Sequence, residues 1–225
     1  MNTRFLLICI SLLMGSCSPG VGPQALRPSP VSESMPDCSS PFPRGRWQFV
    51  HAIQGNLPHG MKTSAIGVTE ISSRTRAAHC ILMTAEGFVL FDGVLDEEIT
   101  INRAVRPFDS PAFAQGLMDD IKSVFFPPQG QLTQTGTLKN SAQVCRYKQQ
   151  DGTVVDVIMP LNGGWEIRHY RQNRLIRSVH AYPEKGSPGE TREPISPRIT
   201  LTAHRPTPYT LNFRCIRAEP MDGPK

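Results

Sequence analysis

Apolar and polar residues alternate along much of the chain. Residues 165–171, for example, place Trp165, Ile167 and His169 on one face and Arg and polar residues on the other. Alternation with a period of two is typical of strands that are buried on one side, and the short turns between the runs favour antiparallel neighbours. The pattern predicts about eleven strands, at residues 46–53, 63–71, 77–83, 88–94, 98–104, 143–148, 153–159, 165–171, 175–182, 198–204 and 209–217.

Between the fifth and sixth of these runs the period changes to that of a helix. Ser110 can cap the free N–H groups, Pro111 suits the first helical position, and two prolines at 127–128 end the run. We predict one amphipathic helix over residues 112–125. The adjacent Asp119 and Asp120 do not face each other on such a helix and are expected at its solvated edge rather than as a catalytic pair.

An antiparallel sheet of this many strands curls instead of staying flat. We therefore predict a mainly β fold, a curled antiparallel sheet with the helix across its mouth, as a single domain at residues 46–217 with a tail at 218–225. The space between helix and sheet is either filled by side chains or open to a ligand. The residues expected to line it, with simple core packing as the alternative for each, are Phe49, Leu82, Phe88, Leu90, Leu117, Ile121 and Trp165.

The first residues of the chain have the three parts of a secretory signal. Arg4 precedes an apolar run at 5–14, and small residues stand directly before Cys17. Ten apolar residues are too few to span about 30 Å of hydrocarbon as a helix, so cleavage is expected. A plain cleaved signal with a chance cysteine is one interpretation of this start.

The run Leu-Leu-Met-Gly-Ser-Cys at 12–17 also resembles the lipobox of bacterial lipoproteins. The resemblance implies a diacylglycerol thioether on Cys17, cleavage before it, and acylation of the new amino terminus. A multiply acylated cysteine anchors a protein stably to a membrane. Residue 18 is Ser, and in the enteric sorting rule that this resembles, Asp at this position favours the inner membrane. The expected location is the outer membrane, facing the periplasm.

Seven prolines with interspersed Ser and Gly occupy residues 18–45, and apolar residues are few there. This composition predicts an extended tether of residues 18–45 between the anchor and the domain. The mature chain keeps four cysteines, which allow two disulfides in three connectivities in an oxidising compartment. A bond from the cysteine near the end of the tether would fasten the tether to the domain. The four disulfide candidates are Cys38, Cys80, Cys145 and Cys215.

Composition excludes several classes of function. The net charge of +5 is scattered without a basic stripe, so no nucleic acid is expected as a partner. The cysteines and histidines lack the spacing of metal ligands, so neither a metal nor a cofactor is expected. The six histidines fall in no recognisable catalytic motif, and we predict that the protein is not an enzyme. Four arginines at 168–177 form the densest positive cluster, either as a solvated strand edge or as a contact for anionic headgroups or an acidic partner.

The order of elements resembles a known superfamily. The chain has a central CILMTAEGFVLFDGV hairpin, the proline-bounded helix SPAFAQGLMDDIKSVFFPP, the strand GGWEIRHY and the terminal pair SPRITLTAHRPTPYTLNFRCI. These are similar to the LolA/LolB lipoprotein-localisation superfamily over most of residues 46–217. The resemblance implies a half-open antiparallel barrel whose helical lid covers an apolar cavity for acyl chains. It also places Leu57, in a hairpin loop, where LolB-like proteins carry a leucine that contacts the membrane.

The sequence is compatible with two functions. The first is an outer-membrane lipoprotein that binds or transfers acyl chains or lipoproteins, with membrane lipid and a lipoprotein carrier as partners. The second is a structural or assembly lipoprotein, such as a scaffold or pilotin, with a filled β core. A cavity that opens when the helix moves distinguishes the first from the second.

Overall fold

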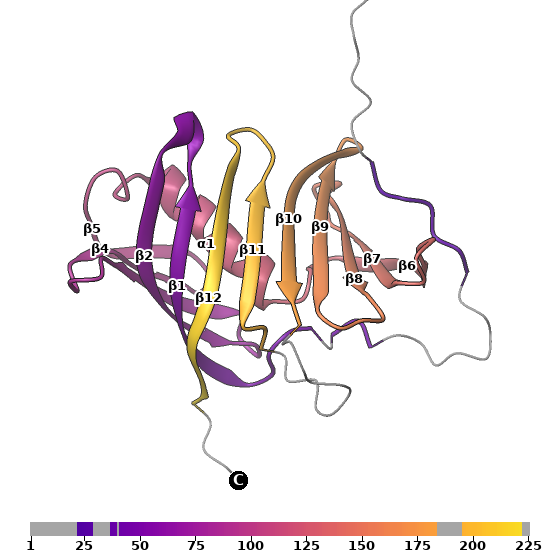
Figure 1. Cartoon of the computed structure of the whole chain (residues 1–225), viewed down its shortest axis with the longest axis horizontal. Coiled ribbons are helices and arrows are strands. Elements are labelled where there is room, and N and C mark those ends of the chain that lie inside the picture. Colours follow the sequence, from indigo (N-terminus) through magenta and orange to yellow (C-terminus); the bar gives the residue numbers. More distant parts are fainter. Residues whose placement is uncertain (1–21, 29–36, 40, 184–194, 222–225) are drawn as a thin grey trace, which may run out of the picture.

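The computed structural model describes residues 22–28, 37–39, 41–183 and 195–221 (Figure 1). They form twelve strands, a short 3-10 turn and the helix α1 (Pro111–Phe125). The first five strands are β1 (Arg46–Asn56), β2 (Lys62–Ser72), β3 (Ala77–Met83), β4 (Val89–Leu95) and β5 (Ile99–Ala104), with the turn η1 (Pro58–Gly60) between β1 and β2. After the helix come β6 (Gln131–Thr137), β7 (Gln143–Lys148), β8 (Val154–Met159), β9 (Trp165–Arg171), β10 (Arg174–Tyr182), β11 (Arg198–Ala203) and β12 (Tyr209–Pro220).

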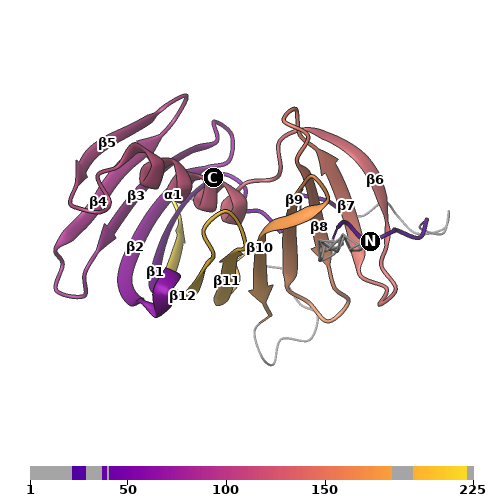
Figure 2. The ribbon, with the colours of Figure 1, turned by 90° about the horizontal axis from the view of Figure 1, so that it is seen from above.

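All twelve strands belong to one antiparallel sheet in the order β5-β4-β3-β2-β1-β12-β11-β10-β9-β8-β7-β6. The chain therefore starts in the middle of the sheet and reaches one edge at β5. The helix then carries it to the other edge at β6, from which it returns to the middle. Figure 2 shows how the sheet curves and how α1 lies in its hollow. The prediction of a curled, mainly antiparallel sheet with one helix is confirmed.

The alternation of side chains fixes which residues face the hollow. In β1, Phe49 and His51 are buried on the concave face, and Val50 between them faces outward. In β8 and β9, Val155, Val157 and Ile167 lie on the concave face and are almost completely buried. The main hydrophobic core thus lies between the concave face of the sheet and the helix.

The structure has one strand more than the sequence pattern predicts. The missed strand is β6, whose residues are mostly polar and exposed. It is an edge strand with solvent on both faces, so no alternation marks it. At the other end of the chain, β12 continues to Pro220 because Ala218, Glu219 and Pro220 pair with the first residues of β1.

Two pieces of the proline-rich segment pack against the domain. Arg27 and Thr137 exchange two backbone hydrogen bonds of 2.9 Å, so residues 22–28 lie against the free edge of β6. Leu26 packs on a small apolar cluster whose members are Leu138, Ala142, Val144 and Ile158. These residues therefore do not behave as an extended tether.

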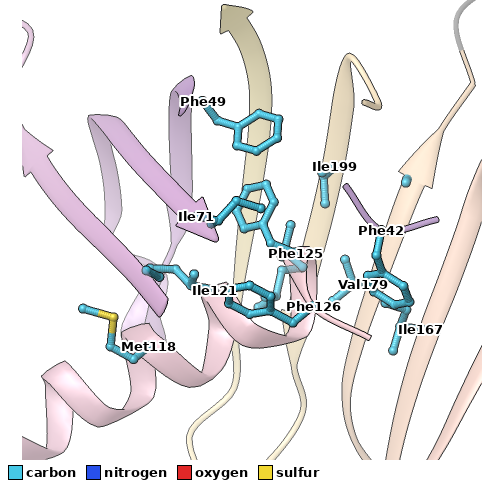
Figure 3. Close-up of a cluster of buried hydrophobic side chains, with 14 of the residues drawn as sticks. Phe42, Phe49, Ile71, Met118, Ile121, Phe125, Phe126, Ile167, Val179 and Ile199 are labelled. Carbon is cyan, nitrogen blue, oxygen red and sulfur yellow. The ribbon is translucent and has the colours of Figure 1, made fainter. Parts of the chain in front are cut away.

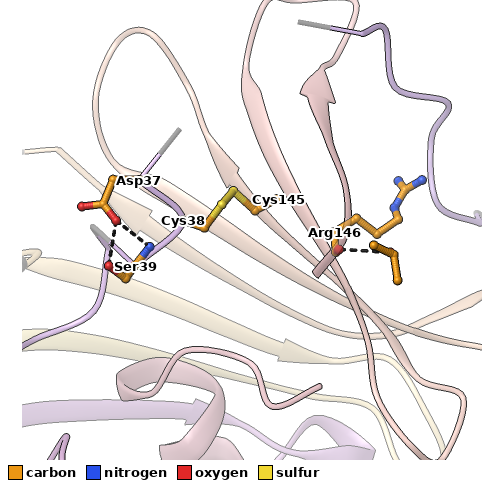
Figure 4. Close-up of a disulfide and its surroundings, with 6 residues drawn as sticks. Asp37, Cys38, Ser39, Cys145 and Arg146 are labelled. Atoms are coloured by element: carbon orange, nitrogen blue, oxygen red, sulfur yellow. Dashed lines mark hydrogen bonds between the residues drawn. A yellow bond between two sulfur atoms is a disulfide. The ribbon is translucent and has the colours of Figure 1, made fainter. Parts of the chain in front are cut away.

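The second piece covers the concave face near β7 to β9. Cys38 forms a disulfide with Cys145 of β7, with 5.8 Å between the Cα atoms (Figure 4). Phe42 is 3% exposed, and its ring centre lies 6.4 Å from that of Trp165. Among the described residues Cys80 and Cys215 are free thiols, so one of the two possible disulfides forms. The expectation that Cys38 fastens the tether to the domain is confirmed.

Candidate functional site

The helix α1 begins and ends where the sequence predicts. Ser110 accepts a hydrogen bond of 3.1 Å from the backbone N–H of Phe113, and Pro111 occupies the first helical position. The helix stops at Phe125, just before the two prolines at 127–128. These caps fix the register that turns the apolar side of the helix toward the sheet.

The contact between helix and sheet is aromatic at its centre. The ring of Phe125 stacks on Phe49 of β1 at 4.8 Å (Figure 3). The same ring lies 6.0 Å from the imidazole of His51. His51 in turn meets the edge of Phe213 at 5.9 Å. Burial lowers the pKa of His51 to about 4, so the imidazole is neutral and takes part in the apolar layer.

Beside the aromatic contact, a cluster of polar side chains joins the helix to the sheet. We define this polar cluster as Asp120 of α1, Arg177 of β10, Tyr209 of β12 and His169 of β9. Arg177 Nε lies 3.0 Å from Asp120 Oδ1 as an ion pair without hydrogen-bond geometry. The Tyr209 hydroxyl donates a hydrogen bond of 2.6 Å to Asp120 Oδ2. The expectation that Asp120 lies at a solvated edge is wrong, because the helix turns this side toward the sheet and leaves Asp120 5% exposed.

Burial dominates the protonation of this cluster. Desolvation raises the pKa of Asp120 to about 6, although the positive charge of Arg177 and the bond from Tyr209 oppose the rise. Desolvation and the same arginine lower the pKa of His169 to about 3. Its Nε2 is shielded from solvent and has no hydrogen-bond partner in the described part of the chain. The cluster therefore stores unfavourable electrostatic energy at the place where the helix meets β9, β10 and β12.

The space beneath the helix is almost filled. The gap bounded by Phe49, Phe125, Trp165 and Ile199 has a volume of about 10 Å³, too little for an acyl chain. A polar cleft of about 270 Å³ opens beside the end of the helix, where His169, Arg177 and Lys122 line it. A larger hollow of about 730 Å³ is lined mainly by outward-facing residues of β1, β11 and β12, away from the helix.

The predicted lining residues divide into three groups. Phe49, Leu82, Ile121 and Trp165 are buried in the main core, whereas Leu90 and Leu117 are half-buried against it. The assignment of Phe88 to the core is wrong: it precedes β4 in the turn from β3 and is 52% exposed, with Arg103 over its ring at 6.0 Å. The helix places other side chains at the contact, and these are Met118, Val124, Phe125 and Phe126.

Three of the four clustered arginines have acidic partners. Arg168 pairs with Glu166 at 2.6 Å, Arg171 with Asp151 at 2.9 Å, and Arg177 with the buried Asp120. The cluster is therefore largely neutralised, and it supports a structural role better than an anion-binding one.

Side-chain pairs that could begin a catalytic site lie apart. Ser178 Oγ of β10 is 3.1 Å from Nε2 of His204, the residue directly after β11, whereas His79 Nε2 of β3 is 2.9 Å from Asp92 of β4. Within residues 22–28, 37–39, 41–183 and 195–221, no group of three His, Cys, Asp or Glu side chains could hold a metal ion. Over the same residues, no helix is long and apolar enough to cross a membrane. Cys17 lies outside the described residues.

The fold and the site define a half-open curled sheet whose concave apolar face is covered mainly by one helix. The sequence matches no family model and no curated protein. The structure is similar to that of a LolA superfamily protein from Nitrosomonas europaea, with a TM-score of 0.55 and 11% identity over 83% of this chain and 91% of the other. It is also similar to an outer membrane lipoprotein-sorting protein domain from Vibrio parahaemolyticus, with a TM-score of 0.53 and 7% identity over 84% and 91%. The chain therefore has a LolA/LolB-like fold, as the sequence resemblance implied.

Proposed function

We propose that this protein is an outer-membrane lipoprotein, anchored through acylated Cys17, which binds acyl chains of lipids or lipoproteins on the concave face beneath α1. The observation that carries the proposal is that, in the described residues, one helix and the short segment around Phe42, and not a second layer of sheet, cover the apolar concave face. The likeness in fold to a lipoprotein-sorting domain supports the same ligand class. No chemistry on the ligand is involved, so the protein acts as a carrier or receptor and not as an enzyme.

Binding requires the helix to move, because the gap beneath it measures only about 10 Å³. Four buried side chains of the helix, Met118, Ile121, Val124 and Phe125, would leave the core. Removing them from the core costs roughly 6–12 kcal/mol at about 1.5–3 kcal/mol each. An acyl chain that buries about ten methylenes returns some 8 kcal/mol at about 0.8 kcal/mol per CH₂, so exchange of helix for ligand is energetically balanced.

The polar cluster lowers the cost of that movement. When the helix leaves, Asp120 and His169 regain water, and the desolvation that shifts their pKa values is relieved. Arg177 remains on the sheet, where it can meet the polar end of a ligand whose chain enters the hollow. The cluster would then favour displacement of the helix by an amphipathic ligand over movement of the helix with no ligand bound.

The filled core favours a second function, that of a structural or assembly lipoprotein whose helix does not move. A displacement assay with a fluorescent fatty acid separates the two. Tyr209→Phe removes the 2.6 Å bond to Asp120 and weakens the closed state by about 1.4 kcal/mol, so the apparent affinity should rise about tenfold. Asp119→Asn is the matched control, because Asp119 is half exposed and pairs only within the helix, with Gln115 and Lys122.

The outcomes differ for the two functions. Probe binding that is strengthened by Tyr209→Phe and unchanged by Asp119→Asn supports a ligand site beneath the helix. If the wild type and both variants exclude the probe, the acyl-chain function is refuted and the filled-core function remains.

A further inference from the structure

The packed N-terminal segment limits how far the domain can lie from its anchor. Gly22 lies against the turn between β9 and β10, where a side chain on Gly22 would come within 3.3 Å of the Asn173 carbonyl oxygen. Gly22 comes five positions after Cys17 in the sequence. Fully extended, this stretch of chain spans at most about 18 Å.

The segment is held at several points after Gly22. Arg146 donates a hydrogen bond of 2.8 Å to the Gln24 carbonyl oxygen, and Leu26 packs on the apolar cluster beside β6. Arg27 then pairs with Thr137 through two hydrogen bonds. Figure 1 shows the segment beginning near the tip of β9 and β10 and running past β6.

Five turns between neighbouring strands lie at the same end of the sheet as Gly22. Two of them carry one acidic residue each, Glu86 between β3 and β4 and Asp151 between β7 and β8, and Asp151 is paired with Arg171. The other three join β1 to β2, β9 to β10 and β11 to β12, and Figure 1 shows their tips along one edge of the molecule. These three turns contain no Asp or Glu. They carry exposed basic side chains at Lys62, Arg174 and Arg205, and Met61 is 58% exposed. We call the three turns, residues 57–62, 171–174 and 204–208, the basic rim.

We propose that the basic rim faces the membrane and contacts its anionic headgroups, so that the domain is docked on the bilayer and not held away from it. This inference rests on the anchor at Cys17 in the proposed function. Lys and Arg near an anionic surface each contribute about 1 kcal/mol of attraction, and Met61 can enter the interface. In this orientation β9 to β12, which carry three of the four residues of the polar cluster, end at the surface where lipid would enter.

Energy transfer from a dye on the protein to a lipid acceptor tests the orientation. The full chain, lipidated in its host, is reconstituted in vesicles of phosphatidylethanolamine and phosphatidylglycerol. One dye is placed in the rim through Thr207→Cys and another at the opposite end of the strands through Leu161→Cys, both in a Cys215→Ser background. Seven residues of strand separate the two ends by about 20 Å, so transfer from position 207 should exceed that from position 161 roughly twofold or more.

Release of the N-terminal segment provides the decisive variant. A side chain at Gly136 would collide with the carbonyl oxygen of Arg27. Gly136→Val should therefore free the segment and lengthen the unattached chain between Cys17 and the domain. Thr135→Val, on the same strand, is the matched control. Transfer from position 207 should fall in Gly136→Val and in the triple variant Lys62→Gln/Arg174→Gln/Arg205→Gln, and stay unchanged in Thr135→Val.

The results separate this inference from the function on which it rests. Equal transfer from both positions in a lipidated protein overturns the docking and leaves the anchor intact. An unmodified Cys17 in the mass of the N-terminal peptide overturns both. Failure of fatty-acid binding, with the expected transfer pattern, overturns the acyl-chain function and leaves the docking in place.

Discussion

The disulfide between Cys38 and Cys145 should supply a large part of the stability of this domain. It joins residues 107 apart in sequence. A cross-link that closes a loop of about 100 residues lowers the entropy of the unfolded chain enough to add about 4.7 kcal/mol to the free energy of unfolding. That is a major share of the roughly 5–15 kcal/mol that holds a typical domain together.

The assay is denaturant unfolding of the oxidised wild type, the reduced wild type, and the double variant Cys38→Ala/Cys145→Ala. Cys145 is fully buried, so its replacement also leaves a small void worth about 1 kcal/mol, and the reduced wild type separates that packing loss from the loss of the cross-link. We expect reduction to lower the free energy of unfolding by about 3–5 kcal/mol and to leave the double variant unchanged.

Two results would refute this reasoning. One is a difference below about 1 kcal/mol between the oxidised and reduced wild type, which would mean that the cross-link does not constrain the unfolded chain. The other is a peptide map that links Cys80 or Cys215, which the structure leaves as free thiols.

Three further predictions concern the neutral imidazole and two glycines. Between the unfolded pKa of 6.5 and the folded pKa of about 4, His51 takes up a proton only when the chain is unfolded, so stability should fall as pH falls through this range. The loss, about 3 kcal/mol, should be reduced in His51→Gln and kept in a variant of the exposed imidazole, His180→Gln, in unfolding curves at several pH values. Gly116→Ala should raise the melting temperature by about 2–4 °C, because the added methyl group meets no atom and glycine is unfavourable inside a helix. Gly164→Ala should instead destabilise the protein by about 1–3 kcal/mol, because Gly164 has φ of +72° and a side chain there would collide with the Ala181 carbonyl oxygen; a melting temperature equal to that of the wild type would contradict this.

Elements with a strong local signal could be predicted from the sequence. The strands with one wet face, the helix cap at Ser110 and the stop at 127–128 all follow from spacing and turn chemistry, and the structure confirms them. Strand β6 lacked such a signal because both of its faces are exposed. The burial of Phe42 could not be predicted either, because a single phenylalanine within a proline-rich stretch forms no periodic pattern of apolar residues.

The site was less accessible to the same reasoning. Which side of the helix is buried follows from the apolar spacing, but Asp120 lies on that side only because Arg177 and Tyr209, far away in the sequence, are present to meet it. No local pattern in the chain signals such a pairing. The aromatic contact between Phe49 and Phe125 joins β1 to the end of the helix, and it too depends on how the sheet curls around the helix.

The pairing of β1 with β12 sets the order in which the chain can complete its fold. Strands β1 to β5 pair with sequence neighbours, and so do β6 to β12, but the seam between the two halves joins Trp47 to Pro220 and Asn56 to Thr210. Contacts this distant in sequence form slowly, because the chain must close a long loop before it gains from them. Until β12 is available, β1 therefore keeps an unpaired edge, and an unpaired edge can pair with other chains.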